Sequence, residues 1–235
     1  MPPKKPINSR ASKADKPNST TSLKFPNDLN YKQPKFMISE ITEVSPQIIT
    51  ISNFFNSEYL GKLISRFQTL NLETTPLIKS KEYALRFNDR ISITDEISAA
   101  NLWTHLQSLL LESSYNESIT SEFQQAKGLN PNLRVYRYEK GHHFEKHYDE
   151  SVKVSTSNLK GQTKWTLLIY LTGGDELLGG DTIFYDEMVK GKAHIRVHPE
   201  PGLALLHKHG DDCLLHEAEV VKKGVKWVLR SDVVF

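Results

Sequence analysis

The sequence LRVYRYEKGHHFEKHYD, residues Leu133–Asp149, opens the part of the chain that decides the fold. It begins the first of several short strand-like runs beyond Pro131, separated by turns that contain glycine. The runs are Leu133–Tyr138, Trp165–Leu171, Thr182–Tyr185, Ala193–Val197, Leu203–Leu206 and Val225–Phe235. Many short strands at this spacing predict a sandwich, a barrel or a jelly roll.

The region before these strands predicts one further strand and two helices. Gln47–Ser52 is rich in β-branched residues and predicts a strand, followed by Asn56 or Ser57 as a helix cap. Apolar residues spaced i, i+3, i+4 and i+7 predict amphipathic helices over Leu60–Phe67 and Thr94–Leu110. Helices followed by strands predict an α+β domain in which the helices cover one sheet.

Residues 1–34 differ in composition from the rest of the chain. They hold six of the eleven prolines and almost no aliphatic residues, so we expect a disordered tail. Seven Lys and Arg against two Asp give this tail a charge of +5, which leaves −3 for residues 35–235 of a chain that carries +2 overall. Because the expected folded body is mildly acidic, a nucleic-acid substrate is disfavoured.

Other global features restrict the compartment and the type of metal site. The chain has no run of 18 or more apolar residues, and its start lacks the apolar stretch of a secretory signal, so no membrane association is expected. Cys213 is the only cysteine, which excludes an intrachain disulfide and a cysteine-built zinc module. We therefore expect a cytoplasmic or nuclear protein, in which histidines and carboxylates would hold any metal.

Three residues have the spacing of such a metal site. His147 and Asp149 are two positions apart, so in an extended segment their side chains project from the same face. His216 follows after several predicted strands that can bring the chain back beside the first pair. Two histidines and one carboxylate form the facial triad of non-heme Fe(II) oxygenases, which leaves three coordination positions open. The His-x-Asp pattern alone has little specificity.

Two cations near the end of the chain are candidates for binding a dianionic co-substrate. Lys226 lies ten residues after His216, and Arg230 shares its strand face by the period of two. An inward charge in the apolar run Val225–Phe235 requires a partner. We expect Lys226 to bind the distal carboxylate, with Arg230 either the alternative anchor or a second charge at the pocket mouth. Both could also be ordinary solvent-facing cations.

Three segments resemble the prolyl-4-hydroxylase type of 2-oxoglutarate- and Fe(II)-dependent oxygenase. They are Leu133–Asp149, Thr166–Phe184 (TLLIYLTGGDELLGGDTIF) and His216–Trp227 (HEAEVVKKGVKW), in the order and spacing of that family. The resemblance implies a double-stranded β-helix of the jelly-roll, cupin-like kind, with supporting N-terminal helices. It also implies one oxygenase domain at residues 35–235, whose metal-binding β-core lies at about 131–235.

The resemblance implies roles for individual residues. The matching positions are His147, Asp149 and His216 for iron, Lys226 for the distal carboxylate of 2-oxoglutarate, Tyr138 and Thr166 as polar positions lining the co-substrate pocket, and Gly179 and Gly180 for the turn before an inner strand. A weaker match to a subgroup of fungal and plant oxygenases predicts at most a wall of the substrate cleft. It comprises Arg86, Asn88, Asp89, Arg90, Asp95, Leu102 and Trp103.

The predicted function is hydroxylation of a substrate C–H bond with Fe(II), 2-oxoglutarate and O2, and with ascorbate as a further cofactor. A prolyl-4-hydroxylase-like reaction on a protein or peptide is the first hypothesis. The alternatives are a small-molecule hydroxylase acting on an amino acid, and a non-catalytic binding module that retains the fold. A zinc hydrolase built on the same two histidines and aspartate is a further alternative, in which a cation at Lys226 has no necessary role.

Two features remain open at this level. The polar segment Glu150–Gln162 directly follows the proposed metal carboxylate, so it is either a mobile flap over the substrate or an ordinary surface loop. His207 and His209 alternate along one predicted strand, which makes them the best competitors of the triad for a metal role.

Overall fold

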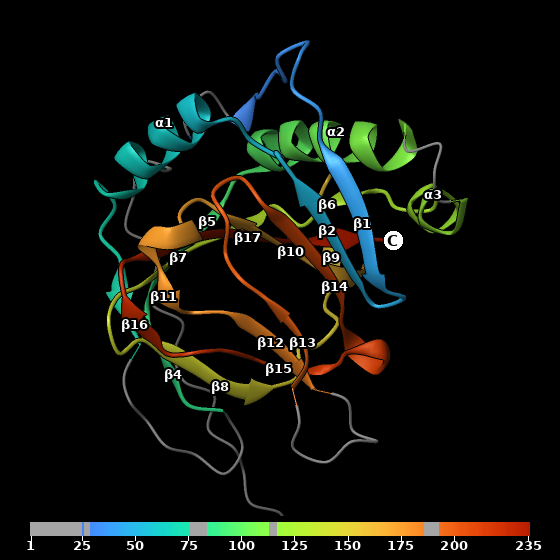
Figure 1. Ribbon diagram of the computed structural model, residues 1–235. Helices are drawn as coiled ribbons and strands as arrows, with labels where there is room; N and C mark the ends of the chain where they lie inside the picture. Colours follow the sequence, from blue (N-terminus) through green and yellow to red (C-terminus); the bar gives the residue numbers. More distant parts are fainter. Residues whose placement is uncertain (1–24, 26–28, 76–83, 113–116, 186–192) are drawn as a thin grey trace, which may run out of the picture.

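Two antiparallel β-sheets face each other in the computed structural model, and three α-helices cover the outer face of the larger sheet (Figure 1). The structure describes residue 25 and residues 29–75, 84–112, 117–185 and 193–235, and the counts of elements here refer to those residues. The arrangement is the jelly roll with supporting helices that the sequence predicts.

The larger sheet contains the strand that ends the chain. Its order is β1 (Glu40–Ser45), β2 (Ile48–Ser52), β14 (Ala204–Lys208), β10 (Lys160–Tyr170), β17 (Lys226–Val234), β7 (Asn132–Tyr138), β5 (Asp89–Thr94) and β3 (Glu73–Thr74), with β6 (Gly128–Leu129) pairing to β17 and β9 (Lys153–Ser155) to β10. Every residue of β17 is buried, because other strands flank it and both of its faces are covered.

The smaller sheet lies opposite, at the bottom of Figure 1. Its order is β13 (Ala193–Val197), β12 (Thr182–Tyr185), β15 (Leu215–Ala218), β8 (His143–His147) and β4 (Arg86–Phe87). A two-stranded ribbon of β11 (Leu178–Gly179) and β16 (Val221–Lys223) lies beside it. Gly179 and Gly180 have φ of 73° and 75°, a left-handed conformation that favours glycine, and they form the predicted turn before β12.

The helices are α1 (Ser57–Phe67), α2 (Glu96–Glu112) and α3 (Glu117–Phe123), and two short 3-10 turns lie at Gly174–Glu176 and Gly210–Asp212. The side chain of Asn56 accepts a hydrogen bond of 2.8 Å from the backbone N–H of Tyr59, and the Asp95 side chain accepts one of 2.9 Å from Ser98. These caps satisfy backbone donors that the first turn leaves free, and they explain where α1 and α2 begin. The sequence predicted α1 and α2 but missed α3.

The larger sheet separates two groups of buried apolar side chains. Trp227 and Leu229 of β17 face the helices, where they join the larger hydrophobic cluster. Val228 faces the smaller sheet, where it joins a second cluster. Because successive side chains on a strand point to opposite faces, Lys226 and Arg230 lie with Val228 in the space between the sheets.

The predicted tail boundary at residue 34 is wrong for the described residues that precede it. Phe25 and Leu29 are buried in the larger cluster, and the ring of Phe25 contacts that of Phe67 with centroids 5.8 Å apart. Tyr31 packs its ring against Phe55 of the same core. Phe25, Leu29 and Tyr31 therefore pack against the core, although the average composition of residues 1–34 is that of a disordered chain. Residues 1–24 and 26–28 of the predicted tail lie outside the described residues.

Among the described helices, none is long and apolar enough to cross a membrane. The predicted strand runs correspond to β7, β10, β12, β13, β14 and β17, and the Gln47–Ser52 run to β2. The short strands β8 and β15 did not appear among those runs.

Candidate metal centre

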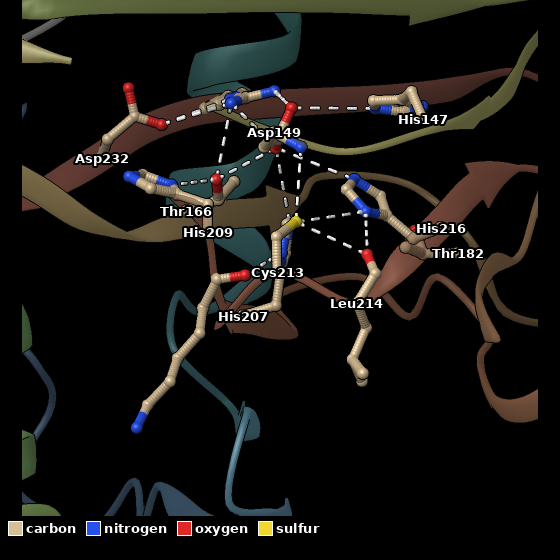
Figure 2. A network of polar contacts seen from close by, with 12 residues as sticks. His147, Asp149, Thr166, Thr182, His207, His209, Cys213, Leu214, His216 and Asp232 are labelled. Atoms are coloured by element: carbon tan, nitrogen blue, oxygen red, sulfur yellow. Dashed lines mark hydrogen bonds and ion pairs between the residues drawn. The ribbon is translucent and has the colours of Figure 1, made fainter. Parts of the chain in front are cut away.

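His147 and His216 are neighbours on adjacent strands of the smaller sheet. His147 is the last residue of β8, and the register of the pair β8 and β15 sets it opposite His216. The two ring centroids lie 4.3 Å apart (Figure 2). The predicted return of the later histidine to the first pair is therefore achieved by direct strand pairing.

Asp149 completes the cluster from the segment that follows β8. Its Oδ1 lies 3.7 Å from Nε2 of His147, and its Oδ2 lies 3.7 Å from Nε2 of His216. One donor atom from each of the three residues lies within 4.8 Å of the others. The structure therefore brings together the three residues that were predicted as metal ligands.

The remaining ring nitrogens orient both imidazoles. Nδ1 of His147 is 2.7 Å from the backbone oxygen of Glu145, and Nδ1 of His216 is 2.9 Å from that of Leu214. Donation from Nδ1–H to these oxygens leaves the Nε2 lone pairs directed at the cluster. Burial and the neighbouring His216 lower the pKa of His147 to about 3, and burial also lowers the pKa of His216. Both rings are neutral at pH 7, as metal ligation requires.

Arg230 and Thr166 hold the carboxylate of Asp149, and Figure 2 shows Thr166 beside it. Nη2 of Arg230 lies 3.0 Å from Oδ2 of Asp149, and the Thr166 hydroxyl donates a 3.1 Å hydrogen bond to the same oxygen. Burial opposes ionisation of Asp149, but Arg230 and the neighbouring imidazoles outweigh it and hold the pKa of this carboxyl well below its usual value. Arg230 also pairs with Asp232, at 3.4 Å.

One cavity is lined both by this cluster and by Lys226. The Lys226 side chain is 2% exposed, and its Nζ donates a 2.6 Å hydrogen bond to the backbone oxygen of Gly180. The rings of Tyr138 and Tyr170 lie 5.5 Å and 5.1 Å from the same Nζ. Within the described residues no carboxylate forms an ion pair with Lys226. Burial lowers its pKa to about 7.

Two of the predicted roles differ from what the structure shows. Thr166 does not line the cavity; its hydroxyl bonds Asp149 and lies 3.0 Å from Nδ1 of His209. Arg230 does line the cavity, but its guanidinium is committed to Asp149 and Asp232 and so is not a free charge at a pocket mouth. Both positions were predicted from strand periodicity or resemblance, which give the face of a strand but not the partner that lies on it.

Among the residues of the weaker motif, Arg86 alone reaches the cavity. Its guanidinium carbon lies 4.1 Å from the ring centroid of Phe144 and 4.8 Å from that of Tyr136. Asp95 caps α2, whereas Leu102 and Trp103 pack into the larger hydrophobic cluster, away from the cavity. The others also have structural positions: Asn88 and Asp89 are buried, and Arg90 is exposed on β5.

The segment Glu150–Gln162, the candidate flap, folds as a β-hairpin. Within it, β9 (Lys153–Ser155) pairs with the first residues of β10, in the register Lys160 to Ser155. The backbone N–H of Val152 donates a 2.9 Å hydrogen bond to the hydroxyl of Thr163. The segment is thus a regular extension of the larger sheet rather than an irregular loop.

Comparison with known proteins agrees with this geometry. Residues 133–231 match the family model described as the 2OG-Fe(II) oxygenase superfamily. A curated relative, "Probable prolyl 4-hydroxylase 3" from Arabidopsis thaliana, is 33% identical over 114 residues, which are 40% of this chain and 39% of the relative. The chain thus matches only about two fifths of that relative's length.

Three solved structures share the fold. The viral collagen prolyl hydroxylase vCPH from Paramecium Bursaria Chlorella virus-1, in its 2OG complex, has a TM-score of 0.52 at 19% identity and covers 80% of this chain and 96% of its own. A Pseudomonas putida prolyl-4-hydroxylase has a TM-score of 0.55 at 14% identity, and the match covers 82% of this chain and 95% of that one. A Trichoplax adhaerens prolyl hydroxylase was solved in complex with a peptide fragment of the hypoxia inducible factor oxygen degradation domain. It has a TM-score of 0.55 at 16% identity, and the match covers 82% of this chain and 85% of that one.

These matches confirm the double-stranded β-helix and the resemblance to prolyl-4-hydroxylase-like 2-oxoglutarate oxygenases. The family model that matches residues 133–231 is named for 2-oxoglutarate and Fe(II), and the donor atoms of the cluster fit iron. Two neutral imidazole lone pairs face one ionised carboxylate, which is an arrangement that a bound cation stabilises.

Proposed function

We propose that this chain, whose residues 133–231 match the 2OG-Fe(II) oxygenase superfamily, is a 2-oxoglutarate-dependent dioxygenase that hydroxylates a substrate C–H bond. One observation carries the proposal: the cavity has two imidazoles and the Asp149 carboxylate at one place and the ammonium group of Lys226 at another. A metal and a diacid can therefore occupy one cavity together. Residues 35–235, together with the anchored segment before them, would form the oxygenase domain.

The side chains divide the work between holding a metal and holding a co-substrate. His147, Asp149 and His216 would bind Fe(II), which when bound supplies the activation of dioxygen that protein groups cannot perform. Lys226 would bind the distal carboxylate of 2-oxoglutarate, because it lines the cavity, is buried, and has no carboxylate partner in the described chain. Arg230 would keep Asp149 ionised and in place rather than bind the co-substrate.

The lining of the cavity suits a reaction that must exclude water. Tyr138 lies beside Lys226, and Val228 and Leu168 contribute apolar surface to the cavity wall. Burial of charged groups in such surroundings strengthens their interaction with an anionic ligand.

We propose a peptidyl proline as the substrate, with a free amino acid as the alternative and a fold-retaining, non-catalytic module as the contrasting case. The curated relative supports the first, as does the Trichoplax enzyme, whose structure contains a peptide. Ascorbate would act as a reductant, as the family resemblance implies. A cytoplasmic or nuclear site of action is supported by the presence of one cysteine, Cys213, in the chain.

The test is succinate release from 2-oxoglutarate in the presence of proline-containing peptides and free amino acids. His147→Ala, Asp149→Ala and His216→Ala should each abolish release with the fold preserved, because each removes one donor of the cluster. His143→Ala is the matched control, since this histidine lies on the same strand but does not line the cavity. Wild-type activity in any one of the three ligand variants would contradict the proposal, and so would failure of every substrate to stimulate succinate release by the wild-type protein.

A further inference from the structure

Arg86 is a third cation that lines the cavity, beside Lys226 and Arg230. It lies on β4, at the edge of the smaller sheet, and is paired in register with Phe144 of β8. Its guanidinium carbon is 4.1 Å from the centroid of the Phe144 ring, which also stacks on the ring of His147 with centroids 3.6 Å apart. The charge of Arg86 therefore lies next to the metal cluster, in contact with the same aromatic ring.

Among the described residues, Arg86 forms no ion pair with a carboxylate. Two acidic residues line the cavity, and both have other partners: Asp149 pairs with Arg230, and Glu217 accepts a 2.6 Å hydrogen bond from the hydroxyl of Tyr185. Nε of Arg86 is a buried donor without a hydrogen-bond partner in the described part of the chain. A buried charged group with an unused donor is unfavourable, and an anion that accepts from it removes the cost.

Arg86 keeps its charge in this position. Burial opposes the charge, but the neighbouring Tyr136 and Tyr138 outweigh it and raise the pKa of Arg86 above its usual value. A guanidinium therefore stays charged at pH values where the ammonium group of Lys226, with a pKa of about 7, loses its proton. Phe144 attracts the charge through the face of its ring but offers no acceptor oxygen, so this contact leaves N–H donors for an anion.

The exposure of the cavity lining indicates which molecule this charge meets. One side of the lining is buried and includes Lys226, Val228 and Thr182, whereas the other is half-buried and includes Arg86, Phe144, His147 and Glu217. A co-substrate that binds the metal through one carboxylate and Lys226 through the other has a partner for each of its two charges. Arg86 remains, on the side of the cavity that a second molecule can approach.

We propose that Arg86 binds a carboxylate of the primary substrate, close to the carbon that is hydroxylated. The proposal rests on the proposed function of the same site and defines its substrate class as anionic. In a peptide the carboxylate would belong to an acidic residue beside the proline or to the C-terminus, and in a free amino acid it would be the α-carboxylate. A guanidinium can hold a carboxylate through two parallel hydrogen bonds, so Arg86 would orient the substrate as well as attract it.

The test compares matched anionic and neutral substrates by kcat/KM for succinate release. The pairs are acetyl-Asp-Pro-Asp amide with acetyl-Asn-Pro-Asn amide, acetyl-Asn-Pro with its C-terminal amide, and free proline with prolinamide. We expect the wild type to favour the anionic member of at least one pair by about 10- to 150-fold, the range for loss of a charged hydrogen bond. The pair that shows the preference identifies the source of the carboxylate.

Three variants connect the preference to Arg86. Arg86→Met should reduce the ratio of kcat/KM values in that pair to about one. Arg86→Glu should lower the ratio below one, because a carboxylate in place of the guanidinium repels the anionic member, and a variant that was merely destabilised would not reverse the preference. Arg90→Met is the matched control, since Arg90 is exposed on β5 and does not line the cavity, and it should keep the wild-type ratio. Co(II) affinity, which visible absorption reports without turnover, should be unchanged in Arg86→Met.

The outcomes separate this inference from the proposed function. Equal kcat/KM values for both members of every pair in the wild type would overturn the role of Arg86 and leave the proposed function in place. A preference that Arg86→Met retains would also overturn it, and a higher requirement for 2-oxoglutarate in that variant would then assign Arg86 to the co-substrate. If no substrate stimulated succinate release by the wild type, the proposed function itself would be wrong, and this inference with it.

Discussion

Nη2 of Arg230 lies 3.0 Å from Oδ2 of Asp149, and the two side chains are 11% and 10% exposed. The carboxylate therefore has a fixed counter-charge before any metal binds. The Arg230 guanidinium in turn has two carboxylates, because Asp232 lies on the same strand face, and together they raise its pKa even though burial opposes its charge. Because Arg230 keeps Asp149 ionised, the fold itself sets the negative charge of this carboxylate, whether or not a metal is bound.

Replacing Arg230 should show how strongly the buried carboxylate of Asp149 depends on its guanidinium. In the metal-free protein Arg230→Met should lower the free energy of unfolding by about 3–5 kcal/mol, since it leaves a largely buried carboxylate without its partner. Urea unfolding measures the change. Arg196→Met is the control: Arg196 is 48% exposed and pairs with Asp181, so its loss should cost less than about 1 kcal/mol. Equal losses in the two variants would show that Asp149 does not depend on Arg230.

Lys226→Met should act on the co-substrate rather than on the metal. Loss of a buried, charged hydrogen bond is worth about 1.5–3 kcal/mol, so the 2-oxoglutarate concentration for half-maximal activity should rise by about 10- to 150-fold. Co(II) affinity should stay unchanged. Lys222→Met, at an exposed residue of β16, is the control. If Lys226→Met needs the same concentration of 2-oxoglutarate as the wild type, Lys226 does not bind the distal carboxylate.

The lowered pKa of Lys226, at about 7, predicts two opposite pH dependences. An unfolded lysine titrates near 10.4, so between about pH 7 and 10 the unfolded state binds a proton that the folded state does not. The free energy of unfolding should therefore rise with pH in this window. Binding of 2-oxoglutarate should weaken over the same window, because it requires the charged form.

Both dependences are isolated by subtracting the behaviour of Lys226→Met from that of the wild type. Urea unfolding and 2-oxoglutarate titrations at pH 6 to 9 supply the data. Parallel pH profiles for the two proteins would show that Lys226 stays charged throughout the range.

Gly179→Ala should shift the backbone carbonyl of the next residue, Gly180, to which Lys226 donates a hydrogen bond. Gly179 has φ of 73°, and an added Cβ would lie 2.3 Å from the backbone oxygen of Val220. We expect a loss of at least about 1–2 kcal/mol in unfolding free energy, together with a higher requirement for 2-oxoglutarate. Gly61→Ala on α1 meets nothing within 4 Å and should instead stabilise by about 0.5–1 kcal/mol. If Gly179→Ala left the free energy of unfolding unchanged, the turn would be able to rearrange and accept the added Cβ.

Local patterns were enough to predict seven of the described strands and two of the three described helices. The period of two along β17 correctly set Lys226 and Arg230 on one inward face, and the spacing of Leu60–Phe67 correctly predicted α1. These predictions succeeded because burial on one face repeats with the geometry of the element itself. The tail boundary failed because a few anchoring residues such as Phe25 do not change the composition of a long window.

The pairing of side chains across strands could not be predicted in the same way. Which carboxylate Arg230 meets, and which residue Thr166 bonds, depend on the register of strands that are far apart in sequence. The same limit applies to His207, whose sequence position suggested a competitor of the triad, whereas the structure sets it beside Asp149 from the opposite sheet. Resemblance indicated His147, Asp149 and His216 as candidate ligands, but it contained no information on the position of His207.

The division of the interior into two apolar clusters has a consequence for how such a protein can diversify. The larger cluster, between helices and sheet, includes Leu63 and Phe67 of α1 and does not touch the cavity, whereas the smaller one includes Val228 and Tyr138 of its wall. Residues around the cavity can therefore be exchanged without changing the larger of the two apolar clusters. Lineages carrying this architecture are free to change which molecule they accept while keeping a stable scaffold.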